Sequence, residues 1–187
     1  MSAWSLPTSL TVGGVGYSIE TDFRKILNIL AMLGDPELEE DEKAVVFIML
    51  FYPDYQLIPR ELYQEAANQA VEFLDMGLGR QDSRRPSTMD WEQDAPVIIP
   101  AVNRVLGREV RAMEYLHWWT FLGAYMEIGE SLFSSVLNIR QKKARGKKLE
   151  KYEEEFYREN RNLIDLKKTP GGPDPGLERL KRQLGFV

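Results

Sequence analysis

Hydrophobic residues recur at helical spacing along most of the chain. The first run, Phe23–Leu33, follows Thr21, whose hydroxyl we expect to cap a helix. Acidic residues from Glu37 to Glu42 suit the first turn of a second helix, which continues through the apolar run Ala44–Tyr52 and ends at Pro53. Because Ala44–Tyr52 is apolar on nearly every face, this helix is predicted to lie deep in the core.

Further helical patterns follow. Pro59 begins one whose apolar positions share a single stripe: Tyr63, Ala66, Ala70 and Phe73. Asp90 or Asp94 is expected to cap the next, which continues past Pro100 to Gly107. The densest pattern is Met113–Met126, a helix that is apolar on most sides. Such a helix is either central to a bundle or partly covered by a neighbouring subunit. An amphipathic segment then leads to Arg140: Leu132, Phe133, Val136 and Ile139.

Two segments break the helical pattern. Leu10–Ile19 consists of two β-prone stretches around Gly13 and Gly14, which can supply positive φ angles at a tight turn, and it predicts a hairpin. A phosphate-binding loop is the alternative, but these glycines do not open a helix within a β-α-β unit. Residues 169–176, Thr-Pro-Gly-Gly-Pro-Asp-Pro-Gly, cannot be helical and are predicted to form a linker.

The C-terminal region has two apolar seams. Leu149, Tyr152, Phe156, Leu163 and Leu166 recur near heptad spacing, which predicts a long helix whose narrow seam needs a partner helix. Beyond the linker, one side of a short basic helix carries Leu177, Leu180, Leu184 and Val187. Such a helix is marginal alone in water.

We therefore predict a mainly α-helical protein. Residues 1–168 are expected to form a single helical bundle domain that includes the β-hairpin at 10–19. A Pro/Gly linker at 169–176 and a tethered C-terminal amphipathic helix at 177–187 complete the chain. A chain of 187 residues fits one domain with appendages.

Composition excludes several classes of function. The chain has no cysteine, which excludes disulfides, Cys-ligated zinc, iron–sulfur clusters and a thiol nucleophile. With 29 acidic residues against 24 Lys and Arg, the net charge near −5 argues against wholesale nucleic-acid binding. The longest apolar run, Val45–Phe51, is far shorter than the roughly 18 residues of a spanning helix, and no signal sequence is visible. We expect a cytoplasmic protein without membrane association.

Two places attract attention as candidate chemistry. Asp90, Glu92 and Asp94 lie within five residues and would suit an acid/base pair or a hard-metal site, but helix capping is the favoured interpretation. His117 is the only histidine, and the chain offers no cysteine or second histidine to complete a site. A hydrogen-bonded, half-buried His117 is therefore expected. We predict no catalytic residue, no metal site and no cofactor.

A basic stretch follows residue 139. Its cations are Arg140, Lys142, Lys143, Arg145, Lys147, Lys148 and Lys151. Such a stretch can hold phosphates, form a solvated linker, or complement the acidic N-terminal half of another copy. All three interpretations stay open.

The order of the motifs is more informative than any one of them. After the hairpin come, in sequence, Ile19-Glu-Thr-Asp-Phe-Arg24, Asp41-Glu-Lys43, Phe51-Tyr-Pro53, Phe73-Leu-Asp-Met-Gly77, Asp90-Trp-Glu-Gln-Asp94, Leu116-His-Trp-Trp-Thr-Phe121 and Ile139-Arg140. This series resembles the bacteriophage protein family called Gp-fifteen, found in phages and prophages of Gram-positive hosts. The resemblance covers roughly residues 12–168.

The resemblance implies a protein of long-tailed phage morphogenesis. Members are encoded between the major tail protein and the tape-measure protein, the position of tail assembly chaperones, helical proteins that coat the tape-measure protein while the tail tube polymerises. It thus implies a non-enzymatic chaperone of the host cytoplasm that self-associates and binds the tape-measure protein, with helix-in-groove recognition. The residues predicted to bind partners are Trp118, Trp119, Phe121, Tyr125, Tyr152, Phe156, Leu177, Leu180 and Leu184. For the Trp-Trp helix, plain core packing is the alternative.

Three other functions compete with this one. The first is a structural tail or head–tail connector protein that stays in the virion. The second is a phage regulator that binds nucleic acid through Arg140–Lys151, and the third is an enzyme that uses Asp90, Glu92 and Asp94.

Overall fold

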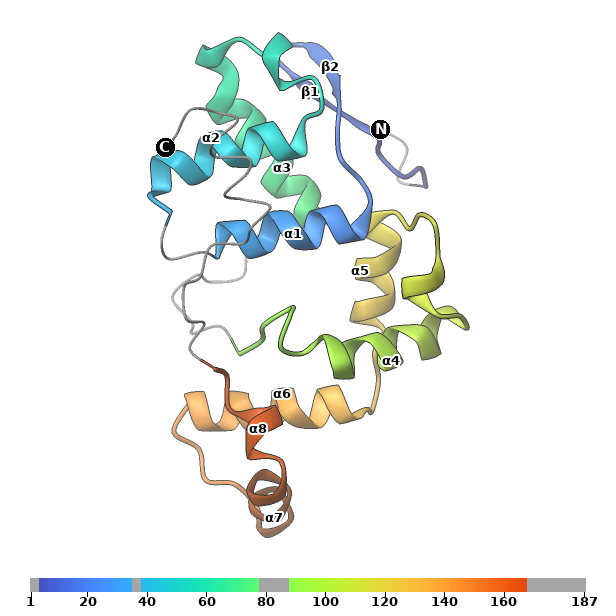
Figure 1. Ribbon diagram of the computed structural model, residues 1–187, viewed down its shortest axis with the longest axis vertical. Coiled ribbons are helices and arrows are strands. Elements are labelled where there is room, and N and C mark those ends of the chain that lie inside the picture. The colour runs from blue at the N-terminus through green and yellow to red at the C-terminus, as the bar shows by residue number, and fades with distance from the viewer. Residues whose placement is uncertain (1–3, 35–37, 78–87, 168–187) are drawn as a thin grey trace. The chain divides into compact units, whose positions relative to one another are not determined.

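The computed structural model describes residues 4–34, 38–77 and 88–167, without the side chains of Glu40 and Asp41 (Figure 1). This part of the chain contains eight α-helices and one two-stranded antiparallel sheet. The prediction of a mainly α-helical protein with a short N-terminal hairpin is therefore confirmed.

The chain divides into two compact units. Among the described residues, the first comprises 4–34 and 38–77, and the second comprises 88–167. The expectation that residues 1–168 form a single domain stays a prediction. The expected linker and C-terminal helix, with Leu177, Leu180 and Leu184, lie outside the described residues.

The first unit begins with the hairpin, whose strands are β1 (Ser9–Val12) and β2 (Val15–Ser18). Val12 pairs with Val15 across a two-residue turn. Gly13 and Gly14 occupy that turn at φ +56° and +80°, a left-handed conformation that glycine adopts at little cost. A Cβ at Gly13 would lie 2.4 Å from Leu62 Cδ1, whereas one at Gly14 would meet nothing within 4 Å.

Helix α1 (Phe23–Leu33) follows the hairpin, and its cap differs from the one expected. Asp22, not Thr21, is the N-cap, and its Oδ1 accepts a hydrogen bond of 2.9 Å from the Arg24 amide. The amides of Thr21 and Asp22 instead donate to the Glu20 carboxylate. The prediction for Thr21 was wrong because a carboxylate one residue nearer the helix is the stronger acceptor.

Helices α2 (Glu40–Phe51) and α3 (Tyr63–Leu74) complete the first unit, joined through the 3-10 turns Tyr55–Leu57 and Arg60–Leu62. α2 packs against both α1 and α3, and α3 also contacts β1. The expected burial of α2 is confirmed on one side only. Its buried positions are Val46, Phe47, Ile48 and Phe51. Ala44 of the same helix is exposed.

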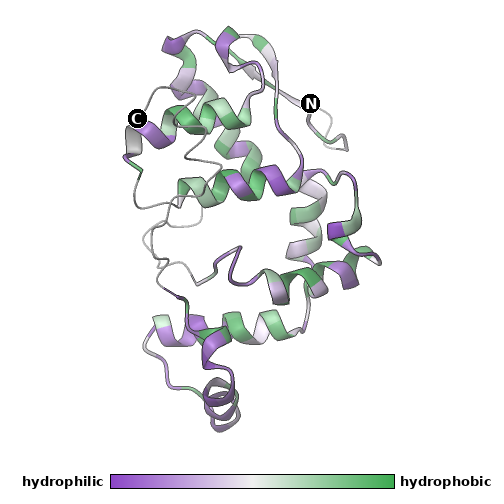
Figure 2. Cartoon of the chain, viewed as in Figure 1, coloured by the Kyte–Doolittle hydropathy of each residue, from purple (hydrophilic) through white to green (hydrophobic). Residues whose placement is uncertain are grey.

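The described part of the second unit contains five α-helices: α4 (Ala95–Leu106), α5 (Trp118–Met126), α6 (Leu132–Ala144), α7 (Lys151–Glu159) and α8 (Arg161–Ile164). α4 packs against α5, α6 and the 3-10 turn Val110–Ala112, while α8 contacts α6 and α7. Figure 2 shows α7 as mostly hydrophilic, in contrast to the apolar stretches of α4 and α6.

The long helix expected over 149–166 is absent, and two short helices take its place. The break falls at Asn160, whose φ of −119° and ψ of 30° are not helical and whose Nδ2 donates to the Phe156 carbonyl. The chain then turns so that Ile164 packs against Val136 and Ile139 of α6. The seam thus finds its partner helix within the same unit.

No helix of the described chain is both long and apolar enough to cross a membrane.

The turn glycines give a matched pair of variants. Gly13→Ala and Gly14→Ala both place a Cβ at positive φ, which costs about 1–2 kcal/mol. Gly13→Ala must also displace the end of Leu62, so we expect it to lower the free energy of unfolding more than Gly14→Ala. Urea unfolding of the two variants measures the difference, and equal losses would contradict the close contact with Leu62.

Candidate functional site

A buried ion pair lies at the centre of the second unit. Arg140 of α6 faces Asp94, the residue before α4, and the two side chains are 5% and 0% exposed. Arg140 Nη1 lies 2.7 Å from Asp94 Oδ2, and Nη2 lies 2.8 Å from Oδ1. This bidentate geometry fixes the guanidinium and the carboxylate in one plane and one orientation.

The remaining Arg140 donors bind backbone carbonyls. Nε donates to Ile164 O at 2.6 Å, Nη2 to Leu163 O at 2.8 Å and Nη1 to Thr88 O at 3.1 Å. All five N–H groups of the guanidinium are therefore used. One side chain thus joins α6, the end of α8 and the segment that leads into α4, an arrangement that we call the Arg140 clasp.

The acidic motif before α4 has a structural role that differs in part from the one expected. Asp90 Oδ1 accepts hydrogen bonds from the amides of Glu92 and Gln93, so Asp90 caps the turn ahead of the helix. Asp94 occupies the N-cap position of α4 but makes no capping hydrogen bond with its side chain. The expectation that the side chain of Asp90 or Asp94 caps this helix was wrong for α4, because the Asp94 carboxylate instead accepts from the Arg140 guanidinium through both oxygens and from the Asp90 amide through Oδ2.

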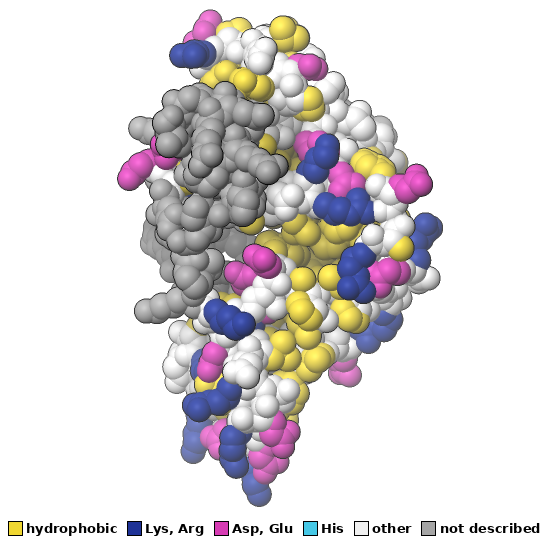
Figure 3. Space-filling model, in the orientation of Figure 1, with side chains coloured by type: hydrophobic (Ala, Val, Ile, Leu, Met, Phe, Trp, Pro, Cys, Tyr) yellow, Lys and Arg dark blue, Asp and Glu magenta, His cyan; other side chains and the backbone are white. Residues whose placement is uncertain are grey.

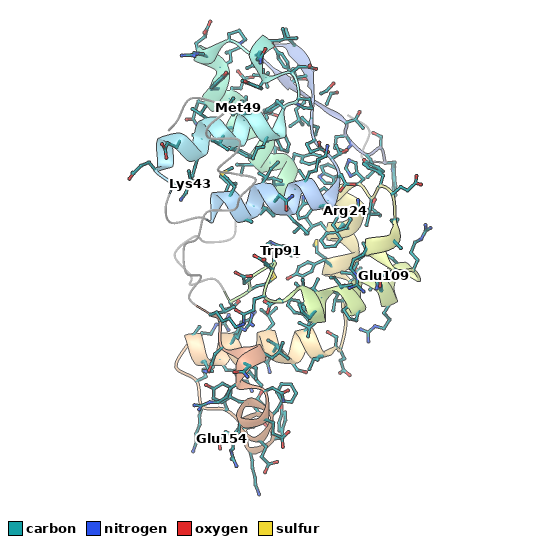
Figure 4. All side chains as sticks on the ribbon, viewed as in Figure 1. Arg24, Lys43, Met49, Trp91, Glu109 and Glu154 are labelled. Carbon is teal, nitrogen blue, oxygen red and sulfur yellow. The ribbon has the colours of Figure 1, made fainter. Side chains whose placement is uncertain are left out.

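Gln93 and Trp91 of the motif also contact other segments of the second unit. Gln93 Nε2 donates to Asp165 O at 3.0 Å, and Gln93 Oε1 accepts from the Lys167 amide at 2.9 Å. Trp91 packs its ring 5.0 Å from that of Tyr125 of α5 (Figure 4). Within the described residues, no group of three or more His, Asp or Glu side chains is arranged to hold a metal ion.

The aromatic helix α5 contributes both to the core and to the surface. Trp118 and Phe121, two residues predicted to bind partners, are buried and stack at 5.8 Å. Trp119 and Tyr125 are half-buried. The Tyr125 hydroxyl donates to Met89 Sδ, and burial raises the pKa of Tyr125 to about 12. Core packing describes Trp118 and Phe121 in this unit, and partner binding by α5 stays a prediction.

The two predicted contact residues of α7 have different surroundings. Phe156 packs against the cluster of Val136, Ile139 and Ile164. Tyr152 is 64% exposed. Tyr152 is therefore the more accessible of the two for a partner.

His117 is the N-cap of α5. Its Nδ1 accepts a hydrogen bond of 3.1 Å from the Trp119 amide, and its side chain is buried rather than half-buried as expected. This role could not be predicted from the residue type, since histidine is not among the usual N-cap residues.

The basic stretch separates into two groups. Arg140 lies in the clasp, Lys142 Nζ lies 2.6 Å from Glu153 Oε1, and Lys143 Nζ lies 2.6 Å from Asp165 Oδ1. The remaining four cations are exposed around the connection from α6 to α7: Arg145, Lys147, Lys148 and Lys151. We call these four the basic loop. Within the described residues none of the four forms an ion pair, so they are available to bind a partner.

Glu153 anchors α7 to α6. It is 2% exposed, and its Oε1 accepts from Lys142 Nζ and from Asn138 Nδ2, while Oε2 accepts from the Glu150 amide. The hydrogen bond from Lys142 holds the pKa of Glu153 below its ordinary value of 4.5. The same bond raises the pKa of Lys142.

The clasp predicts strong coupling between its two charges. Arg140→Met leaves Asp94 buried without its cation, and we expect the second unit to lose about 3–5 kcal/mol of unfolding free energy. Asp94→Leu combined with Arg140→Met removes both charges and should be less destabilising than Arg140→Met alone. Chemical unfolding of the variants measures this coupling. A double variant as unstable as the sum of the two singles would contradict it.

The ion pair of Glu153 with Lys142 is expected to make a contribution to folding stability that is lost in acid. Because the pKa of Glu153 is lowered in the folded state, its stabilisation is present above the ordinary pKa of 4.5 and is lost as pH falls through the folded value. We expect Glu153→Gln to flatten the fall in melting temperature below about pH 4.5. Glu155→Gln, at an exposed position of the same helix, is the control. Identical acid profiles for Glu153→Gln and the wild type would contradict the role of this pair.

Comparison with known families matches residues 4–166 to the family described as Bacteriophage Gp15 protein. The matched residues include Asp94 and Arg140 and nearly all of the region in which the sequence motifs resemble Gp-fifteen. No curated protein and no solved structure matches the chain. The chain is thus a bacteriophage protein, and it belongs to the Gp15 family.

Proposed function

We propose that this protein is a non-enzymatic tail assembly chaperone that acts in the host cytoplasm, self-associates and binds the tape-measure protein. The strongest support for the proposal is that the polar side chains of the sequence motifs are engaged in contacts within the protein itself. Asp90, Gln93, Asp94, His117 and Arg140 all bind groups within the second unit. Since these polar groups hold the fold, we assign the function to the surface rather than to a catalytic centre.

The surface of the second unit suits a protein that holds another chain. Its exposed large apolar residues are Val105, Tyr115, Met126, Leu132 and Tyr152. Figure 3 shows hydrophobic side chains, in yellow, over the region of α4 and α6. Exposed apolar surface is typical of binding sites for other proteins, because its removal from water on binding is favourable. A tape-measure segment with an apolar helix face would bury these side chains.

Co-expression with the tape-measure protein of the same phage tests the proposal. We expect the tape-measure protein to become soluble in a complex with several copies of this chain. Tyr152→Ser should weaken the complex, because it removes an exposed aromatic contact, and Leu6→Ser, at an exposed apolar position of the first unit, is the control. Pull-down and light scattering provide the measurement. A chain truncated after residue 168 tests the predicted contacts at Leu177, Leu180 and Leu184.

An insoluble tape-measure protein beside a monomeric chain would contradict the proposal. A structural tail or head–tail connector protein would then be favoured, and mass spectrometry of purified particles would find the chain in the virion.

A further inference from the structure

Charge is unevenly distributed between the two parts of the chain. Residues 1–78 contain 13 Asp and Glu against 4 Lys and Arg, a net charge of −9. Residues 79–187 contain 16 Asp and Glu against 20 Lys and Arg, a net charge of +4. The overall charge of −5 therefore combines an acidic part with a basic part, and two copies of the chain can attract each other through unlike parts.

The basic surface is the basic loop together with Tyr152. Gly146, at φ +63°, turns the chain after α6, and Arg145, Lys147, Lys148 and Lys151 are exposed around that turn. Lys142 and Lys143, one turn earlier, are held by Glu153 and Asp165. The loop cations thus project beyond the internal ion pairs. Tyr152 directly follows the four cations in the sequence, with 64% of its surface exposed.

The acidic surface runs from the 3-10 turn Arg60–Leu62 along α3. Glu61 in that turn and Glu65 and Glu72 in α3 are all exposed, and the seven-residue spacing of Glu65 and Glu72 places these two on one face of the helix. We call these three the acidic stripe. Residues 61–78 include no Lys or Arg, and the nearest cation in the sequence is Arg60, which directly precedes Glu61.

Two exposed apolar residues lie beside the acidic stripe. Leu57 is 71% exposed and Val15 is 54% exposed. The Tyr17 hydroxyl donates to Leu57 O, and the Gly13 amide donates to Glu65 Oε1, so the hairpin holds these residues near the start of α3. The acidic surface therefore offers carboxylates for the loop cations and an apolar contact for the Tyr152 ring.

We propose that the basic loop and Tyr152 of one copy dock on the acidic stripe, Leu57 and Val15 of a second copy. This inference rests on the proposed function, whose self-association it assigns to two surfaces. Because the surfaces differ, each bound copy still has one of them free, and further copies add in a ring or an open series. Such a series can cover a long tape-measure protein with repeated contacts.

A charge-swap experiment without the tape-measure protein tests this contact. Variant A carries Lys147→Glu and Lys148→Glu, and variant B carries Glu61→Lys and Glu72→Lys. Variant A leaves the basic loop without net charge and variant B makes the acidic stripe positive, so each variant loses the attraction, and we expect the apparent dissociation constant for self-association to rise at least about tenfold. Mixing A with B brings the unchanged basic loop of B to the unchanged acidic stripe of A and should restore assembly of A with B. Sedimentation velocity at about 0.05 M and 0.5 M salt measures the species, and the wild type should fall towards 21.6 kDa at high salt.

Arg108→Glu with Arg158→Glu is the matched control, because it changes the net charge as variant A does at exposed positions outside the basic loop. The control should assemble like the wild type. A wild type that is monomeric at low salt, or A and B that do not assemble when mixed, would overturn the proposal. So would a loop that binds duplex DNA while variant A self-associates normally. None of these results removes tape-measure binding, which the co-expression experiment tests separately.

Discussion

The second unit depends on one guanidinium. Arg140 has five N–H donors, and each finds an acceptor on Asp94 or on the carbonyls of Thr88, Leu163 and Ile164. A buried ion pair contributes little to the net free energy of unfolding, but a buried charge left without its partner lowers that free energy by several kcal/mol. The clasp therefore accepts only the arrangement in which α6, α8 and the segment before α4 meet at this point.

This constraint explains why side chains that suggest chemistry serve the fold. Asp94 is committed to Arg140, Asp90 to the amides of Glu92 and Gln93, and His117 to the start of α5. Among the described residues, every buried side-chain nitrogen and oxygen has a hydrogen-bond partner. The charges and rings left for a partner are those outside this network, above all the basic loop and Tyr152. A Gp15-family protein that works by binding other chains is consistent with this division.

The sequence predicted those elements that depend on residues close to one another in the chain. The Gly13-Gly14 pair predicted the hairpin, because only positive φ closes that turn. The spacing over 149–166 predicted a long helix but could not show that Asn160 breaks it, since the gain comes from packing Ile164 on α6. The cap at Asp94 failed for the same reason: its partner is 46 residues away. Tyr152 and Phe156 were both predicted as contact residues from their spacing. The sequence could not show that Phe156 packs inside the unit while Tyr152 stays exposed.

Native-state hydrogen exchange of the full chain tests the role of the clasp most directly. If Arg140 joins three segments, the amides of α4, α6 and the 161–165 segment exchange through one common opening. They then share one free energy of opening, which falls with denaturant at the same slope for all three. The short helix α8 would then be far better protected than four isolated helical residues. Amides of α8 that exchange independently, close to the unprotected rate, would contradict the account.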